Sequence, residues 1–175
     1  MHEIEAKIKV PALDGFDGKL KELGAEFLHT VEQSDTYFTD TGGQLRESGC
    51  ALRIRQQVID NESSALITFK GPRQDGKFKS RIEYETGVAD VEMTKKIFDS
   101  LGYHGRIVVE KERRMWSLDG CEICLDELPY LGCFVEVEGP DETVITGVLE
   151  KLNLHDEPHI TESYAAMLSG KLKQE

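Results

Sequence analysis

The chain is poor in the residues that build metal clusters and disulfide frameworks. Its 175 residues include only four cysteines and five histidines. Cys121 and Cys124 have the spacing of one half of a zinc site, but no second close pair accompanies them. Both fall within one expected strand, where residues three apart point to opposite faces of the sheet. We therefore expect reduced, mostly buried thiols rather than structural zinc.

Long apolar runs and glycine-rich phosphate loops are also missing. No apolar segment reaches the length of a membrane-spanning helix, and Met1 is followed by alternating charge rather than by an apolar signal segment. No complete P-loop occurs, because Gly71, Gly76 and Lys77 have the G-x-x-x-x-G-K spacing but Phe78 follows in place of Ser or Thr, and no G-x-G-x-x-G loop occurs either. Any phosphate must therefore be bound in another way. No Ser/Gly-rich linker and no fixed repeat interrupts the chain. We expect one domain over residues 1–175, in a soluble, cytoplasmic protein with no membrane partner.

Basic residues are outnumbered by acidic ones. Lys and Arg number 21 against 33 Asp and Glu, which gives a formal net charge of −12. Phosphate backbones attract basic surfaces, so this balance argues against binding to long nucleic acids. Apolar residues make up 39% of the chain, and a chain of this length can bury a core.

Alternation of apolar and charged side chains dominates the sequence that remains. Residues 2–10 alternate strictly, which is typical of a strand with one apolar face. The expected strands cover residues 2–10, 27–39, 50–58, 65–70, 78–87, 105–117, 120–127 and 132–138. Helices are expected at 14–24, 90–101, 141–152 and 160–171, with a helical turn at 44–48 and a polar loop at 60–64. Short turns between successive strands favour an antiparallel sheet or barrel over a parallel sheet.

Glu, Lys and Arg recur on one face of nearly every expected strand. In residues 50–58, for example, Arg53 and Arg55 alternate with Leu52 and Ile54. The pattern alone leaves two interpretations open. The charged faces could lie in water, or a closed sheet could enclose them as the lining of a ligand-binding channel. The second interpretation requires pairing or a bound ligand, because isolated buried charges are costly.

A series of short motifs, in a fixed order, resembles the CYTH superfamily, the triphosphate tunnel metalloenzymes. The motifs are Glu3-x-Glu5-x-Lys7, Gln33-x-Asp35-x-Tyr37-Phe38, Leu52-Arg53-Ile54-Arg55, Thr68-Phe69-Lys70-Gly71-Pro72, Arg81-x-Glu83-x-Glu85, Lys111-x-Arg113-Arg114, Asp126 before a turn at Gly132, and Glu136-x-Glu138. The resemblance runs from residue 2 to about residue 139, and Ser163-Tyr164 extends it into the tail. It is greatest to the class IV adenylyl cyclase branch. Other members of the superfamily are similar to thiamine triphosphatases and inorganic tripolyphosphatases.

The resemblance implies an α+β fold: an eight-stranded antiparallel closed β-barrel, the triphosphate tunnel, with flanking helices. It also implies that the charged faces point inward. Carried over position by position, the carboxylates that would hold Mg²⁺ or Mn²⁺ are Glu3, Glu5, Asp126, Glu136 and Glu138. Both ions prefer hard oxygen ligands and bridge them to substrate phosphates.

The same resemblance assigns the cations to the triphosphate. The expected binding set is Lys7, Arg53, Arg55, Lys70, Lys79, Arg81, Lys111 and Arg113, of which Lys70, Lys111 and Arg113 would be catalytic. Asp35, Tyr37, Glu83 and Glu85 would support the site or the fold, or orient the cations. Only eight of the 21 basic and seven of the 33 acidic residues belong to the inward set. The acidity of the chain therefore belongs to its outer surface, where it favours solubility.

Three functions remain compatible with these residues. The first is an adenylyl cyclase that converts ATP to cyclic AMP and pyrophosphate, by attack of the ribose 3′-hydroxyl on the α-phosphate. The second is a triphosphatase that hydrolyses tripolyphosphate, thiamine triphosphate or a nucleoside triphosphate with water. The third is a non-catalytic module that binds polyphosphate or nucleotide. The resemblance to the cyclase branch favours the first, and it also implies a homodimer.

Overall fold

The computed structural model describes residues 2–74 and 76–173, and it describes side chains from Ile4 onward. The strands are β1 (His2–Val10), β2 (Glu26–Asp40), β3 (Ala51–Ile59), β4 (Glu62–Lys70), β5 (Lys79–Gly87), β6 (Tyr103–Leu118), β7 (Cys121–Leu128) and β8 (Gly132–Glu138). The helices are α1 (Phe16–Glu22), α2 (Gln44–Glu47), α3 (Val91–Ser100), α4 (Glu142–Leu152) and α5 (Tyr164–Lys171). None of these helices is long and apolar enough to cross a membrane.

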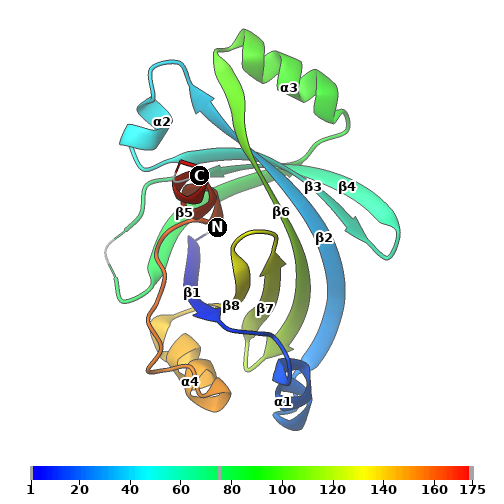
Figure 1. Ribbon diagram of the computed structural model, residues 1–175, viewed down its shortest axis with the longest axis vertical. Coiled ribbons are helices and arrows are strands. Elements are labelled where there is room, and N and C mark those ends of the chain that lie inside the picture. The colour runs from blue at the N-terminus through cyan, green and yellow to red at the C-terminus, as the bar shows by residue number, and fades with distance from the viewer. Residues whose placement is uncertain (1, 75, 174–175) are drawn as a thin grey trace.

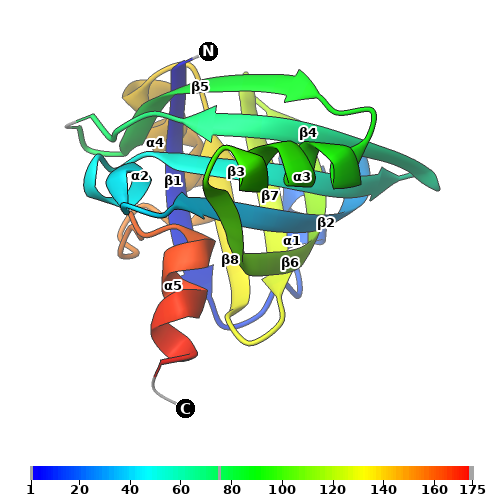
Figure 2. The ribbon, with the colours of Figure 1, turned by 90° about the horizontal axis from the view of Figure 1, so that it is seen from above.

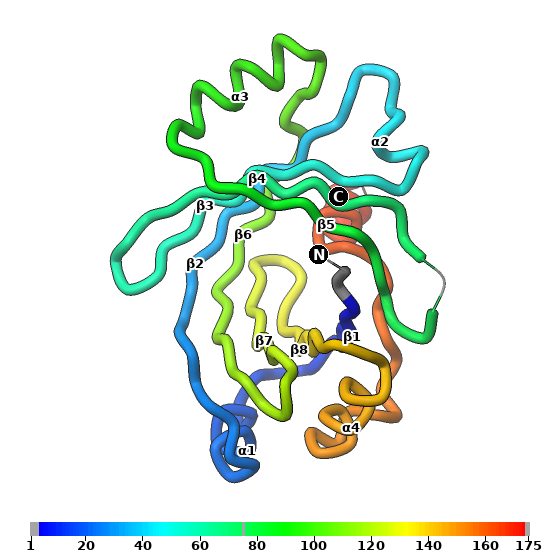
Figure 3. The backbone as a smooth tube through the Cα atoms, turned by 180° about the vertical axis from the view of Figure 1, so that it is seen from behind, coloured from blue at the N-terminus to red at the C-terminus, as the bar shows by residue number. Residues whose placement is uncertain are grey.

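The eight strands pair antiparallel in a ring (Figure 1). Their order around it is β1-β5-β4-β3-β2-β6-β7-β8, and the ring closes because β1 pairs with both β5 and β8. The tube trace outlines the same ring from behind, with α3 and α2 above it and α1 and α4 below it in this view (Figure 3). The expected α+β fold, with eight antiparallel strands and flanking helices, is confirmed.

Helices cover the apolar outer faces of β1, β7 and β8. The helix α4 begins at its cap residue Asp141, whose carboxylate accepts hydrogen bonds from two backbone N–H groups, and it buries Ile145, Val148, Leu149 and Leu152. These side chains pack in one cluster with the outward residues of the three strands, Ala6 and Ile8 among them. Burial of each large aliphatic side chain contributes about 1.5–3 kcal/mol to stability. The apolar face of β1 is thus turned away from the interior of the ring.

The interior of the ring therefore receives the charged face of β1. Glu5 and Lys7 are buried although they alternate with the buried Ala6 and Ile8. A strand that is covered on both faces cannot expose its charges to water, so the solvated-face interpretation fails for β1. The charged residues must instead find partners inside the ring.

The thiols lie as the strand geometry predicts. All four cysteines are free, and Cys121 and Cys124 are buried on opposite faces of β7. Cys121 belongs to the outer apolar cluster, whereas Cys124 is opposite Glu136 on β8. Burial raises the pKa of the Cys124 thiol to about 12. Among the described residues no group of three or more His, Cys, Asp or Glu could hold a metal ion as it stands.

Two expected elements were wrong at their ends. The predicted loop at 60–64 is a two-residue turn, since Asp60 and Asn61 have φ of 50° and 66° and β4 already begins at Glu62. Asp and Asn tolerate the left-handed region that tight hairpins require. The last helix begins at Tyr164 rather than at residue 160. Residues 159 and 160 instead pair with β1, because the Ile160 N–H donates to the Lys7 carbonyl.

Candidate active site

A cavity of about 1950 Å³ occupies the interior of the ring and extends to α2 and α5. It brings together nearly all of the residues that the sequence selected. Those that line it are Glu5, Lys7, Asp35, Tyr37, Arg53, Arg55, Lys70, Lys79, Arg81, Glu83, Glu85, Lys111, Arg113, Glu136 and Glu138. Asp126 is fully buried behind the lining and does not face the open space. The side chain of Glu3, another expected metal ligand, lies outside the described residues.

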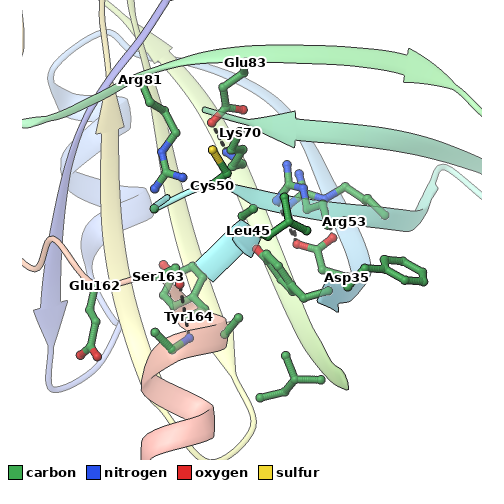
Figure 4. A pocket seen from close by; sticks show the side chains of 18 of the residues that line it. Asp35, Leu45, Cys50, Arg53, Lys70, Arg81, Glu83, Glu162, Ser163 and Tyr164 are labelled. Atoms are coloured by element: carbon green, nitrogen blue, oxygen red, sulfur yellow. Dashed lines mark hydrogen bonds and ion pairs between the residues drawn. The ribbon is translucent and has the colours of Figure 1, made fainter. Parts of the chain in front are cut away.

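One wall of the cavity is an ion-pair cluster around Asp35. The register of β2 and β3 places Asp35 opposite Arg55, and Arg53 lies two residues further along β3. Arg55 donates two hydrogen bonds of 2.7 Å to the Asp35 carboxylate, and Arg53 donates one of 3.1 Å. Burial acts to raise the pKa of Asp35, but the two guanidinium groups hold it far below its usual value. Asp35 therefore stays ionised and fixes both arginines at the cavity wall. Figure 4 shows the Asp35 carboxylate beside Arg53.

A second cluster forms around Asp126 on β7 and the adjacent strand β6, which pairs with β2 on its other side. Arg113 binds both oxygens of Asp126 at 2.6 Å, and the Lys111 ammonium lies 3.1 Å from one of them. The hydroxyl of Tyr164 donates to the same carboxylate at 2.9 Å. Burial, reinforced by repulsion from Arg113, lowers the pKa of Lys111 to about 8. Asp126 thus holds two cavity cations in place from behind.

A third cluster surrounds the carboxylates of Glu5 and Glu136. Lys7 lies 3.3 Å from Glu136 and 3.8 Å from Glu5. Lys79 forms an ion pair with Glu5, and Arg113 reaches Glu136 as well as Asp126. Burial opposes ionisation of Glu136, but Arg113 and Lys7 hold its pKa well below its usual value. Glu138 lies opposite Glu5 across β1 and β8, so Glu5, Glu136 and Glu138 line the cavity from these two adjacent strands.

The remaining cations come from β4 and β5. Lys70 forms an ion pair with Glu83, and Arg81 is buried with its side chain directed into the cavity (Figure 4). The Nε–H of Arg81 is buried and has no hydrogen-bond partner among the described residues. An unsatisfied buried donor on a cation is costly, which points to an anionic ligand at this position.

Three groups that contact the site residues were not among the site residues expected from the sequence. Thr68 accepts a hydrogen bond from Arg53 at 3.3 Å and donates one to Glu85 at 2.7 Å. Its place on the charged face of β4, two residues before Lys70, was a usable signal. Tyr164 and the carbonyl of Glu162, which accepts a hydrogen bond from Lys7 at 3.1 Å, come from the tail. The periodicity of the sequence could not have predicted their contacts with β1 and β6, because these contacts join residues far apart in the chain.

Comparison with known proteins identifies the same family as the sequence motifs do, over almost the whole chain. The CYTH domain model matches residues 1–164. A protein of Methanocaldococcus jannaschii named "Putative adenylate cyclase" is 30% identical over 173 residues, covering 94% of this chain and 97% of its own. An Aeromonas hydrophila adenylate cyclase is 26% identical over 136 residues, covering 77% of this chain and 67% of its own.

Solved structures share the arrangement of strands and helices. The PH1819 protein of Pyrococcus horikoshii is 30% identical with a TM-score of 0.83, covering 97% of this chain and 99% of its own. A Hippeastrum protein whose description reports a dominant triphosphatase activity has a TM-score of 0.69 at 18% identity, over 98% of this chain and 95% of its own. The second likeness concerns the fold alone.

Proposed function

The chain belongs to the CYTH domain family, and on that basis we propose that it is a divalent-metal-dependent enzyme acting on a triphosphate inside its ring of strands. The observation that carries the proposal is the convergence of all eight expected triphosphate-binding lysines and arginines on one cavity. Several strands that are distant in sequence supply them, and the buried Nε–H of Arg81 has no hydrogen-bond partner within the part of the chain that the structure describes. Such a set suits a small polyanion, because arginine binds phosphate oxygens bidentately.

We propose adenylyl cyclase activity as the reaction, with ATP as substrate and cyclic AMP and pyrophosphate as products. Lys70, Lys111 and Arg113 would stabilise the charge that develops on the leaving phosphate oxygens as the 3′-hydroxyl attacks the α-phosphate. The names of the M. jannaschii and A. hydrophila relatives support this choice. Hydrolysis of the terminal phosphate by water would need nearly the same cations, so a triphosphatase is the second candidate.

The carboxylates fit a divalent ion by their chemistry. Glu5, Glu136 and Glu138 line one part of the cavity from the adjacent strands β1 and β8, and carboxylate oxygens are the ligands that Mg²⁺ and Mn²⁺ prefer. We propose these residues as metal ligands, together with Glu3 and Asp126. Asp126 is the most fully engaged, because Arg113, Lys111 and Tyr164 already donate to it. When bound, the ion would neutralise phosphate charge and polarise a phosphoryl oxygen.

Product analysis distinguishes the candidates. We expect ATP with Mg²⁺ or Mn²⁺ to yield cyclic AMP and pyrophosphate in equal amounts, and chelation of the metal to stop the reaction. The panel includes GTP, thiamine triphosphate and tripolyphosphate. Release of orthophosphate without cyclic AMP would replace the cyclase by the triphosphatase. Tight binding of tripolyphosphate without turnover of any compound in the panel would leave a binding module.

Replacing Arg113 by alanine should weaken triphosphate binding. The substitution removes the cation that bridges Asp126 and Glu136 at the cavity wall. Loss of one charge-assisted contact of about 1.5–3 kcal/mol corresponds to a rise in Kd for tripolyphosphate of about 10- to 100-fold. Calorimetric titration measures it. The matched control is Arg114→Ala, because the neighbouring Arg114 pairs with Asp17 of α1 outside the cavity. An unchanged Kd for Arg113→Ala would exclude a binding role.

We also propose a homodimer, as the resemblance to the cyclase branch implies. The helix α3 offers an apolar face for such a contact. Met93, Ile97 and Leu101 on and beside this helix are all more than half exposed. Figure 2 shows α3 lying across the outside of the ring near β3 and β4, away from α5.

A further inference from the structure

The segment that precedes α5 forms part of the cavity wall. His159 pairs with Ile8, the Ile160 N–H donates to the Lys7 carbonyl, and the Lys7 ammonium donates to the Glu162 carbonyl at 3.1 Å. These contacts hold residues 159–162 against β1, and the next side chain, that of Ser163, caps α5 by accepting a hydrogen bond from the Ala166 N–H. The first residue of the helix, Tyr164, is thereby delivered to the cavity (Figure 4).

The ring of Tyr164 contacts two cavity lysines that come from different strands. The Lys7 ammonium on β1 is 4.1 Å from the ring centroid, and the Lys111 ammonium on β6 is 5.1 Å from it. Phe134 contacts the ring edge-on at 5.0 Å between centroids, which limits its rotation. Only 6% of Tyr164 is exposed. A buried ring at these distances attracts cations through its negative face.

The hydroxyl of Tyr164 makes a separate contact with the cation network. It donates at 2.9 Å to the Asp126 oxygen that also accepts from Lys111. Burial and the nearby carboxylates raise the pKa of this hydroxyl well above its usual value, so it remains a donor. Tyr164 thus contacts Lys7 and Lys111 through its ring, and Asp126 through its hydroxyl.

We propose that Tyr164 is a positioning residue of the triphosphate site, which sets the places of Lys7 and Lys111 before the substrate arrives. The inference rests on the proposed function. The strands alone do not determine these places, since each ammonium ends a flexible four-carbon stem. In the ring, β8 and β7 separate β1 from β6, and Tyr164 spans this gap. A cation that is ordered in advance loses less entropy when it binds phosphate.

Three classes of variant separate the contributions of the ring and the hydroxyl. Tyr164→Leu removes both, and Tyr164→Phe removes only the hydroxyl. Phenylalanines carrying one or three fluorine atoms at position 164 keep the shape of the ring while withdrawing electron density from its face. Tyr130→Leu is the matched control, because Tyr130 is exposed in the turn between β7 and β8 and does not line the cavity. The Kd for tripolyphosphate and the kcat and KM for ATP are measured for each variant.

We expect Tyr164→Leu to raise the Kd for tripolyphosphate about 10-fold, since each cation–ring contact contributes a small factor. Tyr164→Phe should raise it no more than about 3-fold, and the fluorinated series should fall between the two in order of fluorine content. KM for ATP should rise in the same order with a smaller change in kcat. The control variant should bind as the wild type does.

Two results would overturn the inference. One is a Tyr164→Leu variant that binds tripolyphosphate within twofold of the wild type. The other is a fluorinated series in which Kd does not depend on fluorine content, which would indicate packing alone. The fluorinated series also decides the matter if Tyr164→Leu fails to fold. A wild-type protein that binds neither tripolyphosphate nor ATP would instead refute the proposed function, whatever the variants do.

Discussion

Glu136→Ala is expected to lower metal-dependent turnover of the substrate by about 10²-fold or more, while the protein stays folded. Metal assistance is worth several kcal/mol of transition-state stabilisation, and each 1.4 kcal/mol is a factor of ten in rate. The protein should tolerate the change because the two cations that Glu136 contacts keep other carboxylates. Arg113 retains Asp126, and Lys7 retains Glu5.

Glu136→Ala should affect the metal-free affinity for tripolyphosphate and the metal-dependent turnover in different ways. Without metal, removal of this carboxylate frees Lys7 and Arg113, so the affinity for tripolyphosphate should stay the same or increase. With metal, the stimulation of turnover should disappear. Rates over a range of Mg²⁺ and Mn²⁺ concentrations, beside metal-free calorimetry, measure both effects. Glu112→Ala on the exposed outer face of β6 is the control. Normal metal dependence in Glu136→Ala would remove Glu136 from the proposed metal site.

Asp35→Asn should be the most destabilising of the substitutions considered. It leaves Arg53 and Arg55 buried without the carboxylate that holds them, and breaking a buried pair in this way costs about 3–5 kcal/mol. Denaturant unfolding at pH 7 measures the loss. Asp14→Asn, at an exposed position before α1, should change the free energy of unfolding by less than about 0.5 kcal/mol.

The pH dependence of the stability difference between the wild type and Asp35→Asn tests whether ion pairing causes it. The pKa of Asp35 is held far below its usual value in the folded protein. Its contribution to stability is therefore complete above the unfolded pKa of about 3.9 and is lost as pH falls toward the folded pKa. The difference in unfolding free energy between the wild type and Asp35→Asn should be constant from about pH 5 to 8 and should shrink below about pH 4. A difference that does not shrink in acid would mean that packing, not ion pairing, accounts for the effect.

The strands were predictable because their signal is local. The alternation in residues 2–10 reflects a strand with two different faces, and the structure places both faces as the period requires. The turn at Asp60 and Asn61 was predictable in place but not in length, since the polar residues that follow it are as compatible with a loop as with the exposed start of β4.

The tail shows where local signals end. Residues 160–163 are compatible with a helix by their composition, yet the Ile160 N–H donates to the Lys7 carbonyl of β1 and the helix begins only at Tyr164. The conformation of this segment depends on its contact with Lys7, about 150 positions away in the sequence, and no local periodicity predicts such a contact. The contact of Tyr164 with two lysines and Asp126 belongs to the same class of long-range contact.

The sequence by itself determined which residues share a face of each strand, and therefore which charges would gather if the sheet closed on its polar side. A side-chain period of two requires no knowledge of the partner strands. The tertiary structure decided that the ring closes around that face, because α4 covers the apolar face of β1, β7 and β8 and leaves the charges inside. It also decided the partner of each charge. Asp126 was expected among the cavity-lining ligands and is instead buried behind Arg113 and Lys111, since ion pairs depend on the register and curvature of strands that meet only in the folded chain.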